Sequence, residues 1–376
     1  FRNNIMGGVA TYLAHRRGDL RAGETWVPKE ETDPEVLARH ILDELERHPG
    51  HWRHNRVAAD AVQSCAHVVT QIVDAARLTS LAMDFSTLEE ESPFIGGSVD
   101  LLSIGINMAR GKAAEALMIL GNRLSENALP WPDSLSKVLN LLETDKDPAI
   151  RGLLLRRMPY LQSYQPVLGW ELFELAMRER TEGLWAIAES CLYYAYHERF
   201  DIVDPWLTHL YREGHGKDLE SWGRISSLAS LSKQKSLSLF LAELKALNSS
   251  DAWQGAASVW RNTGNIQRHR EQCLEGLEAG LDEGSPHAMV VARKCKGLFR
   301  ETAPLILTPK PLLQRIFALL EEDTGSEQRD IYGFDAWLNA VSISNPLLAL
   351  DALEIYLQYV RRRKPVLYDH ENHFTQ

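Results

Sequence analysis

The sequence predicts an all-α protein, and within that class an α-solenoid of antiparallel helix pairs. Apolar residues recur at spacings of three and four along most of the 376-residue chain, which is the pattern of amphipathic helices. The connections between these segments are short and rich in Gly, Asn, Asp, Ser and Pro. Short connections make consecutive helices pack antiparallel. Since no substantial run alternates as a strand does, we expect an elongated, right-handed superhelical array.

The beginning of the chain differs from the rest and is expected to form a helical lead-in or linker region. Asp33 and Pro34 open one of its helices, because Asp caps the first amides and Pro tolerates the first helical position. An acidic run that ends at Ser92-Pro93 marks a boundary. The predicted organisation is therefore a lead-in over 1–93 and a solenoid over 94–376. The helices predicted in the lead-in are 5–17, 33–47 and 56–81.

From residue 94 onward the pattern becomes repetitive. A polar start, an arginine and an Ala/Leu-rich amphipathic run occur twice, and Arg151 follows Arg110 by 41 residues. This spacing lies within the ~40–47 residues of a HEAT or armadillo unit. Asp147 is placed to cap the second copy, with Pro148 at its first position. The pattern is similar to the second helix of a HEAT repeat, whose Asp and Arg tie neighbouring repeats together, so the solenoid is expected to be HEAT- or TPR-like.

Apolar periodicity predicts helices over the remainder of the chain as well, without a sheet. The segment 304–311 is a longer break between them. The helices predicted after Pro166 are 168–180, 184–199, 202–213, 218–231, 235–247, 251–262, 266–281, 286–299, 311–322, 331–341 and 345–360.

Composition limits the classes of function. The net charge is −10, which disfavours a non-specific nucleic-acid coat because such proteins need a strongly basic face. It leaves room for a protein partner that carries basic residues. The four cysteines are scattered without a CxxC pair, so a cytoplasmic location is expected. No apolar run is long enough to span a membrane, and we expect the chain to be part of a longer protein.

No catalytic motif stands out in the sequence. Phosphate-binding, metalloprotease and nucleophile-elbow motifs are missing. Glu243 and Lys245 have the E-x-K spacing of some nucleases, although solvated surface charge is the better interpretation. The basic run Arg361 to Lys364 could contact an acidic partner, but cations also suit a helix C-terminus. We therefore expect no catalytic residue and no cofactor in this chain.

Three histidines lie close together in the turn around Pro49-Gly50. His48, His51 and His54 could hold a metal if the turn folded them together. The plainer interpretation is a solvated turn between helices, and we expect no metal.

The helix predicted over 184–199 has more aromatic surface than one buried face requires. On a helical wheel its aliphatic residues share one side, whereas aromatic residues fall on a second side. Burial of both faces between layers is one explanation. A contact surface is the other, because Tyr and Trp bring a large area with a polar tip. The residues that we predict to bind a partner are Trp185, Tyr193, Tyr196, His197, Trp222 and Arg224.

Several phrases carry a resemblance to a known family, among them GINMARGKAAEAL, DPAIRGLLLRRMPYL, GLWAIAESCLYYAYHERF and DAWQGAASVWRN. From about Ser98 to Gln376 the chain resembles the C-terminal helical-repeat region of bacterial STAND-type ATPases, including Avs-like antiviral members. The resemblance implies a sensor that binds a phage protein of the terminase or portal class. Binding would trigger homo-oligomerisation and activate a separate effector. ATP and Mg would belong to an NTPase region outside this chain.

Three functions follow as hypotheses. The first is this ligand-sensing, protein-binding solenoid, in which the fragment itself is not an enzyme. The second is a helical-repeat enzyme domain of the metal-dependent nuclease kind, using Glu243 and Lys245. The third is a constitutive assembly scaffold that binds host proteins. Convergence of carboxylates or histidines would favour the second.

Overall fold

All regular structure in the described part of the chain is helical. The computed structural model describes residues 1–16, 32–53, 55–86, 100–179, 181, 183–299, 305–323 and 331–363. These ranges contain 21 α-helices and one short 3-10 helix, so the all-α prediction is confirmed. The chain divides into two compact units, unit 1 over Phe1–Tyr194 and unit 2 over Ala195–Gln376.

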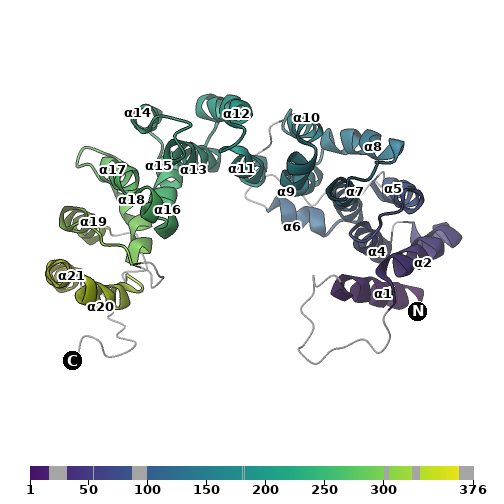
Figure 1. Ribbon diagram of the computed structural model, residues 1–376, viewed down its shortest axis with the longest axis horizontal. Coiled ribbons are helices and arrows are strands. Elements are labelled where there is room, and N and C mark those ends of the chain that lie inside the picture. The colour runs from purple at the N-terminus through teal and green to yellow at the C-terminus, as the bar shows by residue number, and fades with distance from the viewer. Residues whose placement is uncertain are drawn as a thin grey trace. The chain divides into compact units, whose positions relative to one another are not determined.

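Unit 1 is built from two rows of helices. Row A of unit 1 consists of α1, α4, α7 and α9, each packed against the next, and row B consists of α2, α5, α8 and α10 in the same manner (Figure 1). Helices of one row also pack against those of the other, as α5 does on α7 and α10 on α9. The bounds are α1 Arg2–Arg16, α2 Pro34–Arg47, α3 Pro49–Trp52, α4 Arg56–Ala66, α5 Ile72–Ser86, α6 Leu101–Ile106, α7 Ala109–Glu126, α8 Asp133–Glu143, α9 Pro148–Tyr164, α10 Pro166–Ala176 and α11 Leu184–Ala195.

The boundary that we predicted after residue 93 lies outside the described residues. Helices on the two sides of this boundary pack together, since α4 and α5, which precede it, both contact α7, which follows it. The predicted lead-in and the first helices of the predicted solenoid therefore belong to one compact unit.

Unit 2 also has two rows. Row A of unit 2 contains α13, α15, α18 and α20, and row B contains α12, α14, α17, α19 and α21 (Figure 1). The bounds are α12 Phe200–Glu213, α13 Lys217–Leu231, α14 Leu237–Leu247, α15 Ser250–Trp260, α16 Thr263–Arg268, α17 Arg270–Gly280, α18 Ala288–Cys295, the 3-10 helix Lys296–Phe299, α19 Lys310–Glu322, α20 Phe334–Ser344 and α21 Pro346–Arg363.

The helix starts follow from local chemistry. At α9 the Asp147 carboxylate accepts a hydrogen bond from the Ala149 amide at 2.9 Å, and Pro148 occupies the first turn. This cap is the one the sequence predicts. At α15 the Ser249 hydroxyl accepts from the Ala252 amide, directly after Asn248 ends α14 in a left-handed conformation.

Two predicted helices are each divided in the structure. The segment 56–81 forms α4 and α5, separated by a turn in which Val68 and Val69 are buried. The turn places apolar residues in the core just as a helix would, so the apolar pattern continues through it. The segment 266–281 lies in α16 and α17, with a break at His269, whose φ of −135° is not helical.

The two repeated arginines tie successive helices together in the same way. Arg110, on α7, forms an ion pair with Asp145 in the turn after α8. Arg151, on α9, donates hydrogen bonds to the carbonyls of Ala176 and Glu179 at 2.9 and 2.5 Å and to the Thr181 hydroxyl at 3.0 Å. Each row A arginine thus binds the C-terminal end of the next row B helix or the turn that follows it, as the repeat pattern predicts.

Small residues bring α13 and α15 into close contact. A Cβ on Gly223 would overlap the Ala252 carbonyl, and one on Gly255 would overlap the Glu220 carbonyl. The side chains of Ser226 on α13 and Ala256 on α15 are fully buried. Because neither glycine has a side chain, the two helix backbones approach directly. Row A of unit 2 therefore has a tightly packed centre.

Candidate partner-binding surface

The six residues predicted to bind a partner are divided between the two units. Trp185 and Tyr193 belong to unit 1, and the other four belong to unit 2. Each part is therefore considered within its own unit.

In unit 1, the aromatic face of α11 is half buried and half exposed. Trp185 is only 4% exposed, so the expectation that its side chain lies on a contact surface is wrong. Tyr193 is 45% exposed and its neighbour Tyr194 is 64% exposed. Their rings meet edge to face with centroids 5.3 Å apart. The Tyr193–Tyr194 pair presents two large aromatic rings to solvent.

In unit 2, Trp222 belongs to the core. Its side chain is fully buried, with its ring 5.5 Å from Tyr211 and 5.4 Å from Phe240 between centroids. The Lys235 ammonium lies 5.8 Å from the ring centroid. The predicted exposure of Trp222 is therefore wrong, because α13 is covered by α12, α14 and α15 and has little solvent-facing surface.

The remaining predicted residues of unit 2 are accessible to different degrees. His197 is exposed and lies 3.4 Å from the Glu198 carboxylate, while Tyr196 is partly buried with its ring against His197. The His197 carbonyl accepts a hydrogen bond from Gln234 at 3.0 Å. Arg224 is 31% exposed and pairs with Glu220, one helical turn away, at 2.9 Å.

Arg224 is one of three cations that successive row A helices bring together. We call Arg224 on α13, Arg261 at the end of α15 and Lys294 on α18 the basic cluster. α15 packs against both of the other helices. Electrostatic interactions join Lys294 to Arg261, to Arg224 and to Glu220. The sequence reasoning singled out Arg224 alone, although the three cations follow one another at intervals close to one repeat, which is a usable signal.

The packing of row A positions the basic cluster. The Gly255 position lies against the backbone amide of Arg224, so α15 passes close beneath this residue. The guanidinium of Arg261 lies over Gly297, where a Cβ would overlap it. Behind the surface, Trp253 and Trp260 are buried and fix α15 in the core. Close packing thus sets the positions of Arg224 and Arg261.

The surroundings of Lys294 disfavour its charge. Burial lowers the pKa of Lys294 most, Glu220 opposes this decrease, and Arg261 and Arg224 lower the pKa further. The charged form of Lys294 is therefore less stable than that of a lysine in water.

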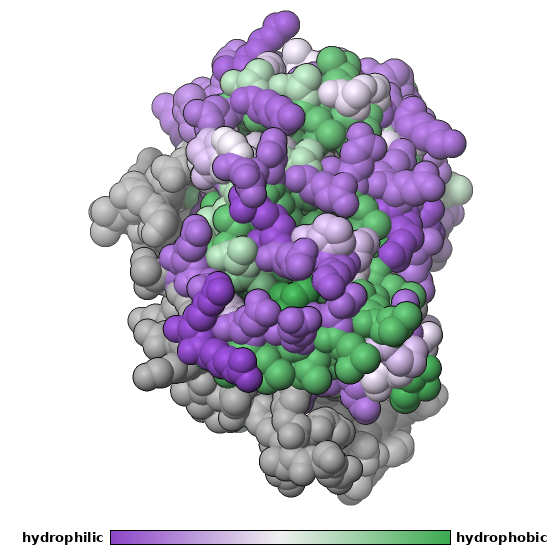
Figure 2. Space-filling view, turned by 90° about the vertical axis from the view of Figure 1, so that its left-hand side faces the viewer, coloured by the Kyte–Doolittle hydropathy of each residue, from purple (hydrophilic) through white to green (hydrophobic). Residues whose placement is uncertain are grey.

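An apolar stripe forms another exposed feature of unit 2. Figure 2 looks onto the end of this unit and shows apolar side chains among hydrophilic ones. The exposed apolar residues of α20 and α21 are Ile343, Leu347, Leu350 and Leu357, with exposed fractions of 82%, 76%, 64% and 42%. The opposite face of α21 buries Ala352 and Tyr359. Helix α21 is therefore apolar on two faces.

The other sequence candidates do not converge into a reactive site. Glu243 forms an ion pair with Lys235 at 2.5 Å, which fits the surface-charge interpretation. Arg362, in the basic run of α21, pairs with Glu321 at 3.1 Å.

The histidine turn is linked to α1. The His51 ring lies 3.0 Å from the Asn3 amide oxygen, and the His48 ring lies 3.9 Å from Glu44. His54 is outside the described residues. Within the part of the chain that the structure describes, no three His, Cys, Asp or Glu side chains are grouped as metal ligands.

The cysteines are not placed to react. All four cysteines are buried and none forms a disulfide. Burial raises the pKa of Cys273 and Cys295 to about 12, so these groups are poor nucleophiles at neutral pH.

Among the described helices, none has the length and apolar character needed to cross a membrane.

Comparisons with known proteins assign the chain to no family. No family model matches the chain, and searches of curated proteins and of solved structures find no match.

Proposed function

We propose that the chain is a HEAT- or TPR-like α-solenoid of antiparallel helix pairs that binds a protein partner. Two features support the architecture: the two rows of helices and the arginine ties at the repeat spacing. In a solenoid each repeat contacts only its neighbours, and the helices of each row in unit 1 pack in this way, each against the next.

The exposed Tyr193–Tyr194 pair carries the proposal of partner binding. Two tyrosines that are 45% and 64% exposed and packed against each other offer a large area at small entropy cost. Tyrosine is enriched among the residues that dominate protein interfaces. Tyr193 is also one of the residues that the sequence indicates for this role.

On the family resemblance, we propose that this binding region is the C-terminal sensor of a cytoplasmic, Avs-like STAND ATPase. The partner is a phage-encoded protein, of the terminase or portal class. Binding favours the oligomerising state of the parent protein by differential affinity. Catalysis belongs to the NTPase and effector regions of the parent protein.

Affinity capture tests this proposal. The tagged chain is used to capture proteins from bacterial cells before and after phage infection, and a phage protein is expected only after infection. Tyr193→Ala with Tyr194→Ala should weaken capture at least ~10-fold, as for interface hot spots. The matched control is Tyr160→Ala with Tyr164→Ala, which removes two exposed tyrosines of α9 in the same unit.

Each outcome has a distinct meaning. Capture of the same host protein from both cultures would contradict a phage sensor and support a constitutive scaffold. Equal loss of capture in the two double variants would contradict a specific role for the α11 tyrosines.

A further inference from the structure

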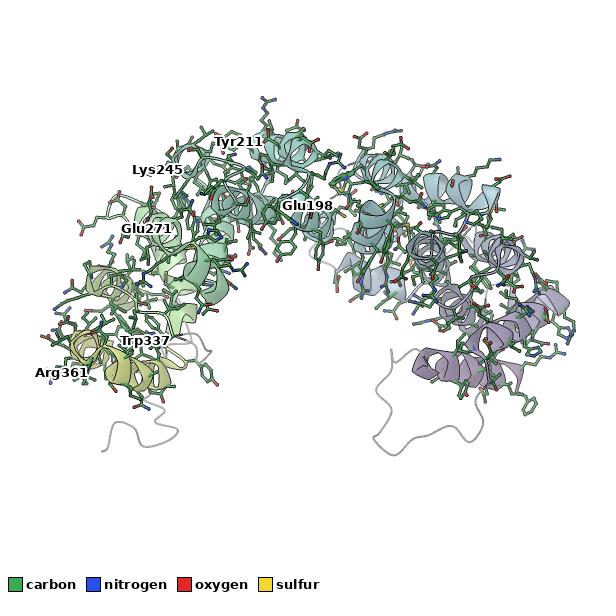
Figure 3. The ribbon with its side chains drawn as sticks, viewed as in Figure 1. Glu198, Tyr211, Lys245, Glu271, Trp337 and Arg361 are labelled. Carbon is green, nitrogen blue, oxygen red and sulfur yellow. The ribbon has the colours of Figure 1, made fainter. Side chains whose placement is uncertain are left out.

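Three polar side chains of unit 2 form a hydrogen-bonded series that joins two turns. The Ser250 hydroxyl oxygen lies 3.0 Å from Nδ1 of His287, and Nε2 of the same ring lies 2.9 Å from the side-chain oxygen of Asn248. Asn248 ends α14, Ser250 begins α15, and His287 directly precedes α18. Figure 3 labels Lys245 in the last turn of α14, shortly before Asn248.

The two partners of the imidazole determine where its proton lies. An amide oxygen only accepts hydrogen bonds, so Nε2 of His287 carries the proton and donates to Asn248. Nδ1 of the neutral ring is then an acceptor, and the Ser250 hydroxyl donates to it. Burial lowers the pKa of His287 from its ordinary value of 6.5, which keeps the ring neutral at neutral pH. His287 is therefore in the protonation state that a general base requires.

The serine of this series is accessible, whereas the imidazole is shielded. Ser250 and Asn248 are exposed, and His287 is only 7% exposed. Helix α15 packs against α18, and the neighbouring residues Ala252 and Ala288 are buried. Packing thus holds the imidazole in place while the serine stays open to solvent.

The start of α15 favours negative charge. The first amides of an α-helix have no acceptor within the helix, and the helix dipole places partial positive charge there. The Ala252 amide donates to the Ser249 hydroxyl, whereas the amides of Ser250 and Asp251 have no carbonyl within the helix to bind. Backbone amides of this kind stabilise the oxyanion that forms during acyl transfer.

We propose that Ser250 is the nucleophile and His287 the general base of a hydrolase-type site for short acyl esters, with Asn248 as a positioning residue. A hydroxyl, an imidazole and a third group that orients the imidazole are the parts that activate serine on unrelated folds. A short acyl group suits a serine that is open to solvent. This activity is independent of the proposed partner binding and separate from the ATP chemistry of the parent protein.

The proposed reaction hydrolyses one ester in two stages. Oγ of Ser250 bonds to the carbonyl carbon and gives its proton to Nδ1 of His287, after which the bond to the alkoxy oxygen breaks and the alcohol leaves with that proton. Water then attacks the acyl group and gives a proton to Nδ1. That proton returns to Oγ as the carboxylic acid leaves, so the site ends in its starting state.

A fluorophosphonate probe tests the nucleophile on the full chain. Oγ of an activated serine displaces fluoride from the probe, and mass spectrometry locates the resulting phosphonyl group, which we expect on Ser250. Ser250→Ala should abolish this adduct, and His287→Gln should slow its formation at least ~100-fold, because a general base contributes that much. The rate in the wild type should rise with pH and reach half its maximum below pH 6.5, since only the neutral His287 ring accepts the proton.

The positioning role of Asn248 has its own readout. Asn248→Gly suits the left-handed backbone of this residue, whose φ is 50°, and removes the side-chain acceptor. This variant should be labelled at least ~10-fold more slowly. Asn248→Asp keeps an acceptor oxygen, so it should retain labelling and move the pH profile to higher pH, because a carboxylate stabilises the charged imidazole. A residue that only stabilised the fold would leave the pH profile unchanged.

Ser238 provides the matched control. It is exposed in the first turn of α14, and its hydroxyl is hydrogen-bonded to that of Ser236 at 2.8 Å. Ser238→Ala should be labelled as fast as the wild type, and melting temperatures establish that every variant is folded.

Three results would overturn the proposal: no adduct on Ser250 of the wild type, equal labelling of Ser250 and Ser238, or an unchanged rate in His287→Gln. The three side chains would then be a structural tie between the turns. Transfer of the acetyl group from p-nitrophenyl acetate to Ser250, detected after an acid quench, tests the substrate class. A serine that takes the phosphonyl group but no acetyl group would contradict an acyl-ester substrate.

Discussion

Replacing Arg151 with methionine should destabilise unit 1 by about 3–5 kcal/mol, the range for removing one partner of a buried charged group. Arg151 is 2% exposed and donates hydrogen bonds to three acceptors at the end of α10 and in the turn after it: two carbonyls and the Thr181 hydroxyl. Each buried acceptor left without a donor costs about 1–3 kcal/mol. Methionine retains most of the aliphatic volume, so the loss reports chiefly on the hydrogen bonds and the charge.

Hydrogen exchange measured by mass spectrometry locates the effect. Exchange should accelerate in α10 and at the start of α11, which Arg151 joins to α9, while α13 and α15 of unit 2 keep their protection. Chemical denaturation supplies the free energy of unfolding. Arg156→Met is the control, because Arg156 lies on the same helix and is exposed; its expected cost is below about 0.5 kcal/mol. If Arg151→Met costs no more than Arg156→Met, the tie does not stabilise the fold.

Two further predictions concern a buried acid and the helix crossing. Burial raises the pKa of Glu143 well above 4.5, with Arg151 opposing, and neither carboxylate oxygen has a hydrogen-bond partner among the residues that the structure describes. The contribution of Glu143 to stability is therefore complete below pH 4.5 and is lost as the pH rises through the folded pKa. Denaturation curves measured at several pH values should show this loss, and Glu143→Gln should reduce the dependence on pH and stabilise the protein at pH 7. An unchanged dependence on pH would contradict the assignment. Gly255→Leu should lower the free energy of unfolding by about 2 kcal/mol or more, because the side chain would meet the α13 backbone at Glu220. Gly284→Leu, at a position open to solvent, is the control, and equal melting temperatures would refute the close crossing.

The sequence by itself determined the features that depend on neighbours along the chain. The class of fold follows from apolar spacing, and the start of α9 follows from Asp147-Pro148, since a cap involves residues two apart. The arginine ties were predictable because Arg110 and Arg151 recur at the repeat spacing. Each of these signals is local or periodic.

Only the tertiary structure decided which faces of these helices meet solvent. The burial of Trp185 and Trp222 depends on helices from distant parts of the chain, and a wheel drawn for one helix cannot show them. The apolar pattern of the sequence did not indicate the turn between α4 and α5, because the valines of this turn are buried just as valines on the inner face of a helix would be. Glycines let α13 and α15 approach closely, which brings the backbones at Gly223 and Ala252 into contact although they are distant in sequence. Packing between helices, and not the pattern within any one of them, decided which of the predicted contact residues are exposed.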